Sequence, residues 1–394
     1  MRISPACLLI ALAIPTLADA QQPVARPTGH SVTGLPALNF DADEGFGYGA
    51  LVQYYDYGDG TAAPYRFSLQ PTVFLTTRGR RDVTLFLDAP HMLPNGWRLG
   101  AQLAREQQLT APYYGVGNNT VALESATKGA NPYYYRFGRT VLRANADLQH
   151  ELIVPALRVL IGAGTRSSDV KTTPYDSGTT LLAQQTGKAK LPSINARYAR
   201  VGLVWDTRDR EIGTHAGNWS ELLVQRAGRV LGGDQVFTRI TGSVRQYLPL
   251  TESVTLAERV VMQTVRGDPG ISEIFAVQNS FRDDEVLGGA TSIRGIPKNR
   301  YVGKGLAFAN SELRWSAASF GIAGRPTRMI LSGFVDAGRV WTDGLNISEA
   351  ASDLHVGYGG GARLAIGPTF VVAADVGHSS QTAAAVYVGL GYLF

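Results

Sequence analysis

The chain has 394 residues, of which 45 are glycine and only 18% are charged. A mean hydropathy close to zero excludes a bundle of membrane-spanning helices, and a net charge of +5 is too small to argue for nucleic acid as a partner. After the N-terminus no run reaches the roughly 18 apolar residues that a spanning helix needs. Transmembrane β-barrels have this composition, because their apolar residues are spread over alternating positions.

The first 20 residues read as a secretory signal peptide. Arg2 supplies the charged start, residues 6–14 form a short apolar core, and Ala18-Asp-Ala20 is a small-x-small cleavage site. The core is too short for a membrane anchor. Cleavage would remove Cys7, the only cysteine of the sequence, and leave no disulfide option. We therefore expect export beyond the inner membrane.

Residues 21–35 read as a short periplasmic segment, and residues 36–394 as one barrel domain. From residue 38 onward the chain repeats about ten alternating residues followed by a turn. The expected strands are 38–43, 46–55, 66–78, 81–89, 96–108, 133–149, 156–171, 194–206, 218–230, 235–248, 253–265, 305–316, 328–340, 355–366, 369–379 and 383–394. This pattern predicts an all-β fold, a 16-stranded antiparallel transmembrane β-barrel.

The lengths of the links support this count. If both chain ends are periplasmic, the links at the periplasmic end are mostly short, and the long links 109–132, 172–193 and 266–304 lie at the outer end. In residues 197–208 one parity is apolar, whereas the other carries Arg200, Asp206 and Arg208. Charges on one parity of long strands fit a water-filled lumen better than the wet face of a soluble sandwich.

The link 266–304, between the eleventh and twelfth strands, contains a glycine-rich motif with one cation. Gly288, Gly289 and Gly295 allow a tight loop, and Ile293 and Arg294 lie between them. The next strand has Asn310, Glu312 and Arg314 on one parity. This arrangement predicts a loop that folds inward, where its cation meets a carboxylate on the wall.

The last strand alternates to the end of the sequence, with Tyr392 and Phe394 on one face. A C-terminal aromatic residue on such a strand resembles the sorting signal of Gram-negative outer-membrane barrels. An ordinary last strand is the alternative. With the signal peptide, the first interpretation places the protein in the bacterial outer membrane.

Four motifs, in this order along the chain, resemble the BamA/TamA-like bacterial surface antigen superfamily of outer-membrane barrels. They are Tyr113-Tyr-Gly-Val-Gly-Asn118, Asp206-Thr-Arg-Asp209 with Gly217, Gly288-Gly289 with Ser292-Ile-Arg-Gly295, and Phe334-Val-Asp336-Ala-Gly338. The resemblance extends from about residue 36 to Phe394. Ile296 stands where the loop motif usually has an aromatic residue. The segment before the first strand has no room for the POTRA domains that receive client polypeptides in better-known relatives.

The resemblance implies that Arg294 projects from the inward loop to Asp336, with Glu312 beside it and Gly338 in the same strand motif. Such an ion pair is either a latch that holds and releases the loop or a static brace. The resemblance also implies a monomer in outer-membrane lipid that inserts or translocates polypeptide or lipid. Its partners would be unfolded client polypeptides or separate periplasmic proteins.

A passive or gated pore for small solutes, with residues 266–304 as its constriction, is the alternative function. A weak seam between a short first strand and the last strand favours assembly, whereas a tight seam around an open lumen favours a pore. We expect no enzyme, cofactor or metal. Adjacent strand residues such as His378 and Ser379 point to opposite faces, and the six histidines show no zinc-ligand spacing.

Overall fold

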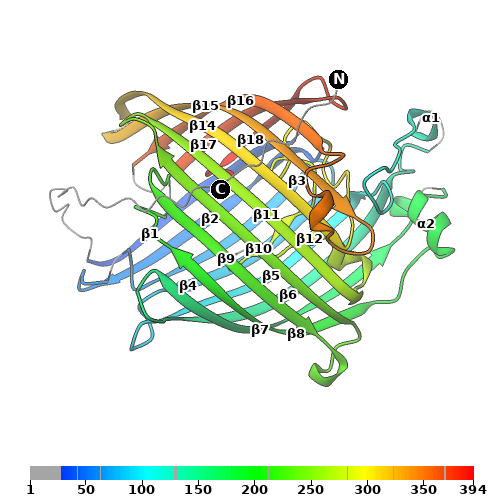
Figure 1. Ribbon diagram of the computed structural model, residues 1–394, viewed down its shortest axis with the longest axis horizontal. Helices are drawn as coiled ribbons and strands as arrows, with labels where there is room; N and C mark the ends of the chain where they lie inside the picture. Colours follow the sequence, from blue (N-terminus) through cyan, green and yellow to red (C-terminus); the bar gives the residue numbers. More distant parts are fainter. Residues whose placement is uncertain are drawn as a thin grey trace.

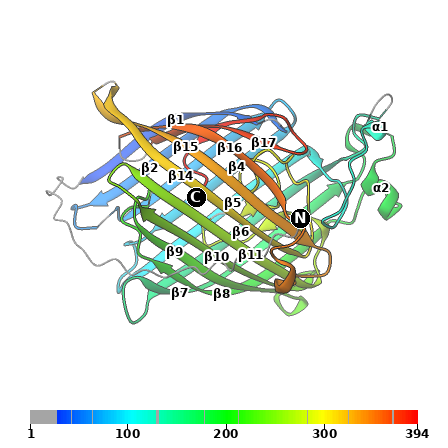
Figure 2. The ribbon, with the colours of Figure 1, turned by 45° about the horizontal axis from the view of Figure 1, so that its top comes forward.

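The computed structural model describes residues 28–394 apart from 42, 63, 128–130, 177, 212, 282, 323, 368 and 369. In these residues 16 strands form a closed antiparallel barrel (Figures 1 and 2). The predicted fold class and strand number are therefore confirmed. The expected signal peptide lies outside the described residues.

The barrel strands follow one another around the wall in sequence order. They are β1 (Gly29–Asp41), β2 (Gly45–Gly58), β3 (Phe67–Thr76), β4 (Arg80–Ala89), β5 (Trp97–Pro112), β6 (Arg136–Glu151), β7 (Leu157–Lys171), β8 (Ile194–Asp206), β9 (Gly217–Ala227), β10 (Val236–Pro249), β11 (Val254–Asp268), β14 (Gly305–Ile322), β15 (Arg325–Trp341), β16 (His355–Ile366), β17 (Phe370–Ser379) and β18 (Ala385–Leu390). The short strands β12 (Ala276–Val277) and β13 (Asp284–Glu285) form a separate two-stranded sheet within the link between β11 and β14.

Alternation of side chains decides which face of each strand lies inside. On β8, Val201, Leu203 and Trp205 are 54%, 45% and 40% exposed on the outer surface, whereas Arg200 is only 4% exposed. A one-residue slip in register would turn the arginine to the lipid side, so the pattern specifies the register strongly. No helix in the described part of the chain is long and apolar enough to cross a membrane.

The two ends of the barrel differ as the link lengths predict. The short helices α1 (Glu124–Thr127) and α2 (Leu181–Thr186) lie in long links at one end, on the right of Figure 1. We call this the outer end, and the opposite end, where the short turns lie, the periplasmic end. The largest buried apolar cluster includes Tyr113 and Phe275 and packs residues of the β11–β14 link against the wall and a neighbouring outer link.

Both ends of the chain differ from the expected pattern. Strand β1 begins at Gly29, so residues 29–35 belong to the barrel and not to a preceding segment. The Gly and Pro residues there read locally as a loop, but β1 pairs with β2 along its whole length. Pro36 is tolerated because β1 has a partly free edge on its other side. At the other end, β18 stops at Leu390, short of the expected residue 394.

The barrel closes between β1 and β18 through very few paired residues, and we call this junction the seam. Among the described residues, only two pairs are in register there, Phe40 with Val388 and Asp41 with Tyr387. By contrast, β10 and β11 pair continuously from Val236–Asp268 to Pro249–Thr255. The first strand is therefore long and the last strand is short, the reverse of the expectation, but the seam is weak. It is closed at the outer end, and the edge of β1 is free toward the periplasmic end.

Candidate functional site

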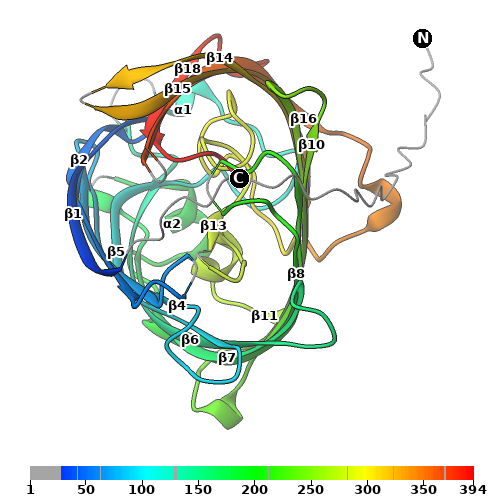
Figure 3. The same cartoon turned by 90° about the vertical axis from the view of Figure 1, so that its left-hand side faces the viewer.

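The link between β11 and β14 turns back into the barrel, and we call residues 269–304 the luminal loop. Figure 3 shows it inside the ring of strands. Its first half is acidic and meets arginines of the wall: Glu273 is 2.9 Å from Arg239 on β10, and Asp283 is 2.7 Å from Arg143 on β6. The charges of loop and wall are thus complementary on this side of the lumen.

The second half of the luminal loop is basic and meets carboxylates. The Arg294 side chain reaches β14, β15 and β17, and the Lys298 ammonium group lies 2.6 Å from Glu44 in the β1–β2 turn. The loop therefore carries charges of opposite sign toward opposite parts of the wall. This separation specifies its orientation inside the barrel, because a reversed loop would bring like charges together.

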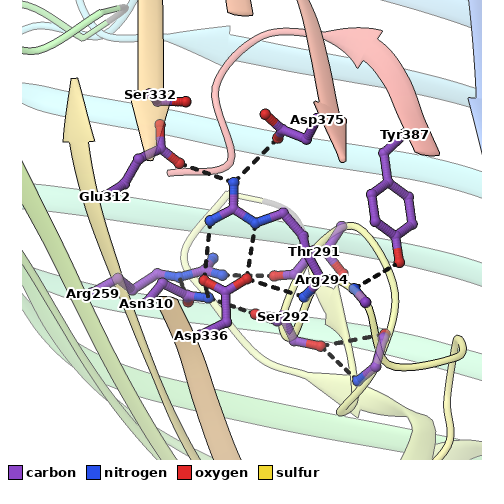
Figure 4. Close-up of polar contacts among 12 residues, drawn as sticks. Arg259, Thr291, Ser292, Arg294, Asn310, Glu312, Ser332, Asp336, Asp375 and Tyr387 are labelled. Atoms are coloured by element: carbon purple, nitrogen blue, oxygen red, sulfur yellow. Dashed lines mark hydrogen bonds and ion pairs between the residues drawn. The ribbon is translucent and has the colours of Figure 1, made fainter. Parts of the chain in front are cut away.

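Arg294 is fully buried and binds Asp336 in three ways (Figure 4). Its Nε and Nη2 donate to the two carboxylate oxygens at 2.8 and 3.0 Å, and its main-chain N–H donates to the same group at 3.0 Å. Its Nη1 donates to Glu312 at 3.0 Å and to Asp375 at 3.2 Å. A planar guanidinium can meet three carboxylates in this way, whereas an ammonium group is a point charge.

The charges around Arg294 balance. Glu312 also accepts from Arg314 Nε at 3.0 Å, and Arg363 binds Asp375 at 2.5 and 3.0 Å. Three arginines thus share three carboxylates, counting Asp336. Burial disfavours the charged guanidinium of Arg294, but hydrogen bonds to Asp336 and the neighbouring carboxylates outweigh this effect and raise its pKa. The cation is a permanent part of the site.

The backbone of the motif needs its glycines. Gly288, Gly289 and Gly295 have φ values of +106°, +89° and +91°, which strain residues with a Cβ atom. Between them the side chain of Ile293 is fully buried in the apolar cluster, next to Ile296. Gly338 does not contact Arg294. It lies against Phe308 on the neighbouring strand, where a Cβ atom would also approach Leu287 of the loop.

The luminal loop also reaches both sides of the seam. The main-chain N–H of Gly295 donates to the Tyr387 hydroxyl on β18 at 3.1 Å. On the other side, the main-chain N–H of Lys298 donates to Asp43 at 2.7 Å, next to the Glu44 that binds its side chain. The two contact points are three residues apart in the loop. The loop therefore bridges the seam from inside, beside the two residue pairs that close it.

Comparison with known proteins identifies the family. The model of the Omp85 superfamily domain matches residues 60–387, which is more than half of the chain. The chain belongs to the Omp85 superfamily. This finding agrees with the resemblance that the motifs show. No curated protein sequence matches the chain.

Two solved structures share the fold of this Omp85 barrel. The crystal structure of BamA from Haemophilus ducreyi lacking POTRA domains 1–3 is 12% identical, with a TM-score of 0.57, and the match covers 93% of this chain and 70% of that one. CdiB from Escherichia coli is 13% identical, also with a TM-score of 0.57, and the match covers 95% of this chain. The same match covers only 64% of the CdiB chain, so the present chain spans less than two thirds of the length of CdiB. At these identities the likeness concerns the fold alone.

The C-terminal residues of this Omp85 barrel turn into the lumen (Figure 3). Gly391 has a φ of +91° and marks the point where the chain leaves the sheet. The carbonyl oxygen of Phe394 accepts from Arg314 Nη2 at 3.1 Å, and the guanidinium of Arg314 lies over the rings of Tyr392 and Phe394. Neither aromatic residue lies on a membrane-facing strand, because β18 has already ended.

Several residues of the site lie outside the predicted set. Asp375 is the only charged residue within β17, and that isolation was a usable signal for a luminal partner. Tyr387 and the β1–β2 turn carry no local signal, since their role depends on which segments the barrel brings together. Of the predicted residues, Arg294, Glu312 and Asp336 are in direct contact. Gly338 lies elsewhere, and Tyr392 and Phe394 reach this cluster through Arg314.

The two other motifs of the Omp85 resemblance are structural in this barrel. Asn118 ties outer links together, since its side chain accepts from the main-chain N–H of Val340 at 3.1 Å and donates to the Asp353 carbonyl at 2.9 Å. In the periplasmic turn after β8, Arg208 binds Asp206 through two 2.9 Å hydrogen bonds. Asp209 accepts from two main-chain N–H groups of the same turn.

The wall lies very close to the part of the luminal loop around Arg294, which we call the loop tip. A Cβ atom at Gly357 on β16 would overlap the carbonyl oxygen of Arg294. We expect Gly357→Val to displace the tip and to destabilise its docked position by about 1–3 kcal/mol, the usual effect of overpacking. Trypsin should then cleave the folded barrel after Arg294 or Lys298, both of which are buried.

Gly333→Val is the matched control for this prediction. Gly333 lies on neighbouring β15, and a Cβ atom there meets nothing within 4 Å. The control barrel should resist trypsin in the loop as the unaltered protein does. Equal resistance of the Gly357→Val barrel would show that the loop tip does not depend on this close approach.

Proposed function

We propose that this Omp85 protein inserts or translocates polypeptide or lipid at the outer membrane, and that the seam is the place where it acts. The observation that carries the proposal is the pairing of β1 with β18 through only two residue pairs. A backbone hydrogen bond contributes roughly 1 kcal/mol net, so opening this seam costs far less than separating any fully paired strands of the wall. The part of β1 that is not paired with β18 offers N–H and C=O groups to an incoming strand.

The filled lumen supports this function over a passive pore. Two small cavities border the luminal loop. One, of about 210 Å³, is lined by charged residues of both signs, among them Glu44, Arg80 and Asp283. The other, of about 280 Å³, is lined by Arg245 and Asp284, among others. The loop fills the middle of the barrel, and many ion pairs with the wall hold it there. Membership of the Omp85 superfamily, whose members act in assembly and transport, also supports the proposal.

Depletion of the protein in its own bacterium, followed by an inventory of outer-membrane proteins and lipids, tests the function. We expect loss of one or more barrels, exported polypeptides or lipids from the outer membrane, and recovery on re-expression. An unchanged inventory, combined with reduced uptake of small solutes, would contradict the proposal and support the pore.

We propose that the luminal loop is a latch for the seam. Arg294 anchors the loop to β14, β15 and β17, and the adjacent residues hold β18 and the β1–β2 turn. A client strand that enters at the seam would compete with these contacts. The loop then couples the occupancy of the seam to the position of Arg294.

We propose that Tyr392 and Phe394 act as a sorting signal before folding and pack inside the lumen afterwards. Phe394→Ala is expected to lower the amount of folded barrel in the outer membrane several-fold. The check is the ratio of heat-modifiable protein in that membrane to total protein. Leu354→Ala, at an exposed apolar residue of an outer link, is the control. If both variants reach the membrane equally, Phe394 has no sorting role.

We also propose that the protein is not an enzyme. In the described residues no group of three or more His, Cys, Asp or Glu side chains is arranged to hold a metal ion. His378 Nδ1 lies 2.8 Å from the carbonyl oxygen of Ala383, while Ser379 donates to the carbonyl of Gly295 at 2.7 Å. The two side chains thus serve separate structural contacts. Assay of the purified barrel with lipid and ester substrates would contradict the proposal if turnover were detected.

A further inference from the structure

The hairpin of β14 and β15 is longer than its neighbours at the periplasmic end. The two strands pair with each other as far as Ile322 and Arg325. The pairing of β14 with β11, however, ends at Trp315 and Val254. Figures 1 and 2 show the yellow-to-orange tip of this hairpin beyond the neighbouring strand ends. In the part of the chain that the structure describes, a segment of β14 therefore has a strand partner on only one side.

This one-sided segment comprises Ala318–Ile322, and we call it the free edge. The last contact on its open side is the hydrogen bond from Ser316 N–H to the Ser253 carbonyl at 2.8 Å. All five residues of the free edge are exposed. On the far side of the hairpin, the carbonyl of Pro326 already accepts from Gly367 N–H, and β16 pairs with β15 from Thr327 onward. Only the β14 side is open.

The free edge lacks the usual protection against strand pairing. Natural edge strands carry charges or prolines that block an added strand. Here the sequence Ala-Ser-Phe-Gly-Ile has neither, and the hairpin's proline lies on the covered side. A register shift at Ser316–Ala318 bends the hairpin away from the wall, but it leaves the five residues beyond it extended and paired with β15.

The positions of two tryptophans indicate that the apolar side chains of the free edge lie beyond the membrane. Trp315 is 49% exposed, and Trp205 is 40% exposed on β8, at the same end of the barrel. Tryptophans at such positions mark the membrane interface. Ile322 lies seven residues beyond Trp315. At roughly 3.3 Å per residue on a tilted strand, this places it about 15–20 Å into the periplasm. Phe320 and Ile322 are nevertheless 44% and 38% exposed.

The charge of the hairpin indicates the chemistry of its partner. Between Ser316 and Ile330 the only charged residues are Arg325 and Arg328, so the tip has a net charge of +2. A strand laid along the free edge would add backbone hydrogen bonds and place alternate side chains beside Phe320 and Ile322. Because Ser319 pairs with Arg328, the remaining side chains of the added strand would lie on the face that carries Arg328, whereas Arg325, opposite Ile322, lies on the apolar face.

We propose that the free edge is a docking site for a separate periplasmic protein, which adds an extended segment with alternating apolar and acidic residues to β14. The edge supplies the hydrogen bonds, Phe320 and Ile322 supply apolar contacts, and Arg328, on the opposite face, selects the acidic side chains. The site lies away from the seam strands and does not depend on the function proposed there.

Hydrogen exchange of the peptide containing the free edge tests the proposal in two settings. In native outer membranes its amides should exchange about tenfold more slowly than in the same membranes stripped of peripheral proteins, because a bound strand protects them. In the purified full-length barrel in lipid vesicles, a synthetic peptide of alternating Val and Glu should restore the protection. A peptide of alternating Val and Lys should not.

Variants and concentration series distinguish the other occupants. Phe320→Lys should abolish the protection by the Val-Glu peptide, whereas Val230→Lys, at a fully exposed apolar residue of an outer link, should preserve it. Heat-modifiability confirms that both barrels are folded. Protection that rises with the concentration of the purified barrel alone would identify a second copy as the occupant. Protection in stripped membranes or in peptide-free vesicles would identify lipid. Either result, or equal protection by the two peptides, would overturn the proposal.

Discussion

Replacing Arg294 by alanine is expected to lower the stability of the barrel by about 3–5 kcal/mol, the usual cost of removing one partner from a buried ion pair. The change leaves Glu312, Asp336 and Asp375 close together with one cation fewer. The carboxylates of Glu312 and Asp336 are fully buried and that of Asp375 is 11% exposed, so water replaces the lost charge poorly. The temperature at which the compact form disappears on denaturing gels measures the effect.

Two further variants separate charge from geometry. Arg294→Lys should recover only part of the stability, since an ammonium group cannot reproduce the two parallel hydrogen bonds to Asp336. The double variant Arg294→Ala/Asp336→Ala should be less destabilised than the sum of the single changes, because it removes both partners of the closest pair.

Arg266→Ala is the control for these variants, since Arg266 is exposed at the outer end of β11. Its compact form should survive to the same temperature as that of the unaltered barrel. If Arg294→Ala also left assembly, unfolding temperature and single-channel conductance unchanged, the motif would be neither latch nor brace.

Locking the seam is expected to abolish function in the cell. In the variant Phe40→Cys/Val388→Cys the new thiols lie on one of the two pairs that join β1 to β18. The sequence has no cysteine other than Cys7, which the predicted cleavage removes. A short thiol crosslinker would then tie the weakest junction of the wall. In depleted cells the crosslinked barrel should fail to restore the outer-membrane inventory, whereas the untreated variant should restore it.

The matched control is Val244→Cys/Val260→Cys, a directly opposed pair on β10 and β11. Those strands are already joined along their whole length, so the same crosslink should leave function intact. Restoration by both crosslinked barrels would exclude the seam as the site of action. Failure of both would indicate that the crosslinker itself causes the loss.

The strands could be predicted from the sequence because their signal is local. Whether a residue faces lipid or lumen follows from a two-residue alternation, which each strand carries by itself. For example, Val201 and Arg200 are adjacent and point to opposite faces of β8. The cationic loop was also recognisable, because glycine is the residue that most readily adopts its left-handed turns.

The sequence did not predict the structural role of residues whose contacts come from distant segments of the chain. Residues 29–35 look like a linker, and only their pairing with β2 makes them a strand. Phe394 continues an alternating pattern, but cations inside the lumen hold it away from the wall. Tyr387 and Asp43 show no motif, and they matter because the loop passes between them.

The sequence by itself determined the number and order of the strands, their two faces, and a loop carrying Arg294 inward. Only the tertiary structure decided that three carboxylates share this cation and that the loop bridges a seam of two residue pairs. The physical reason is that closing a barrel brings together residues hundreds of positions apart. No local pattern indicates how many residues of the first and last strands will pair with each other.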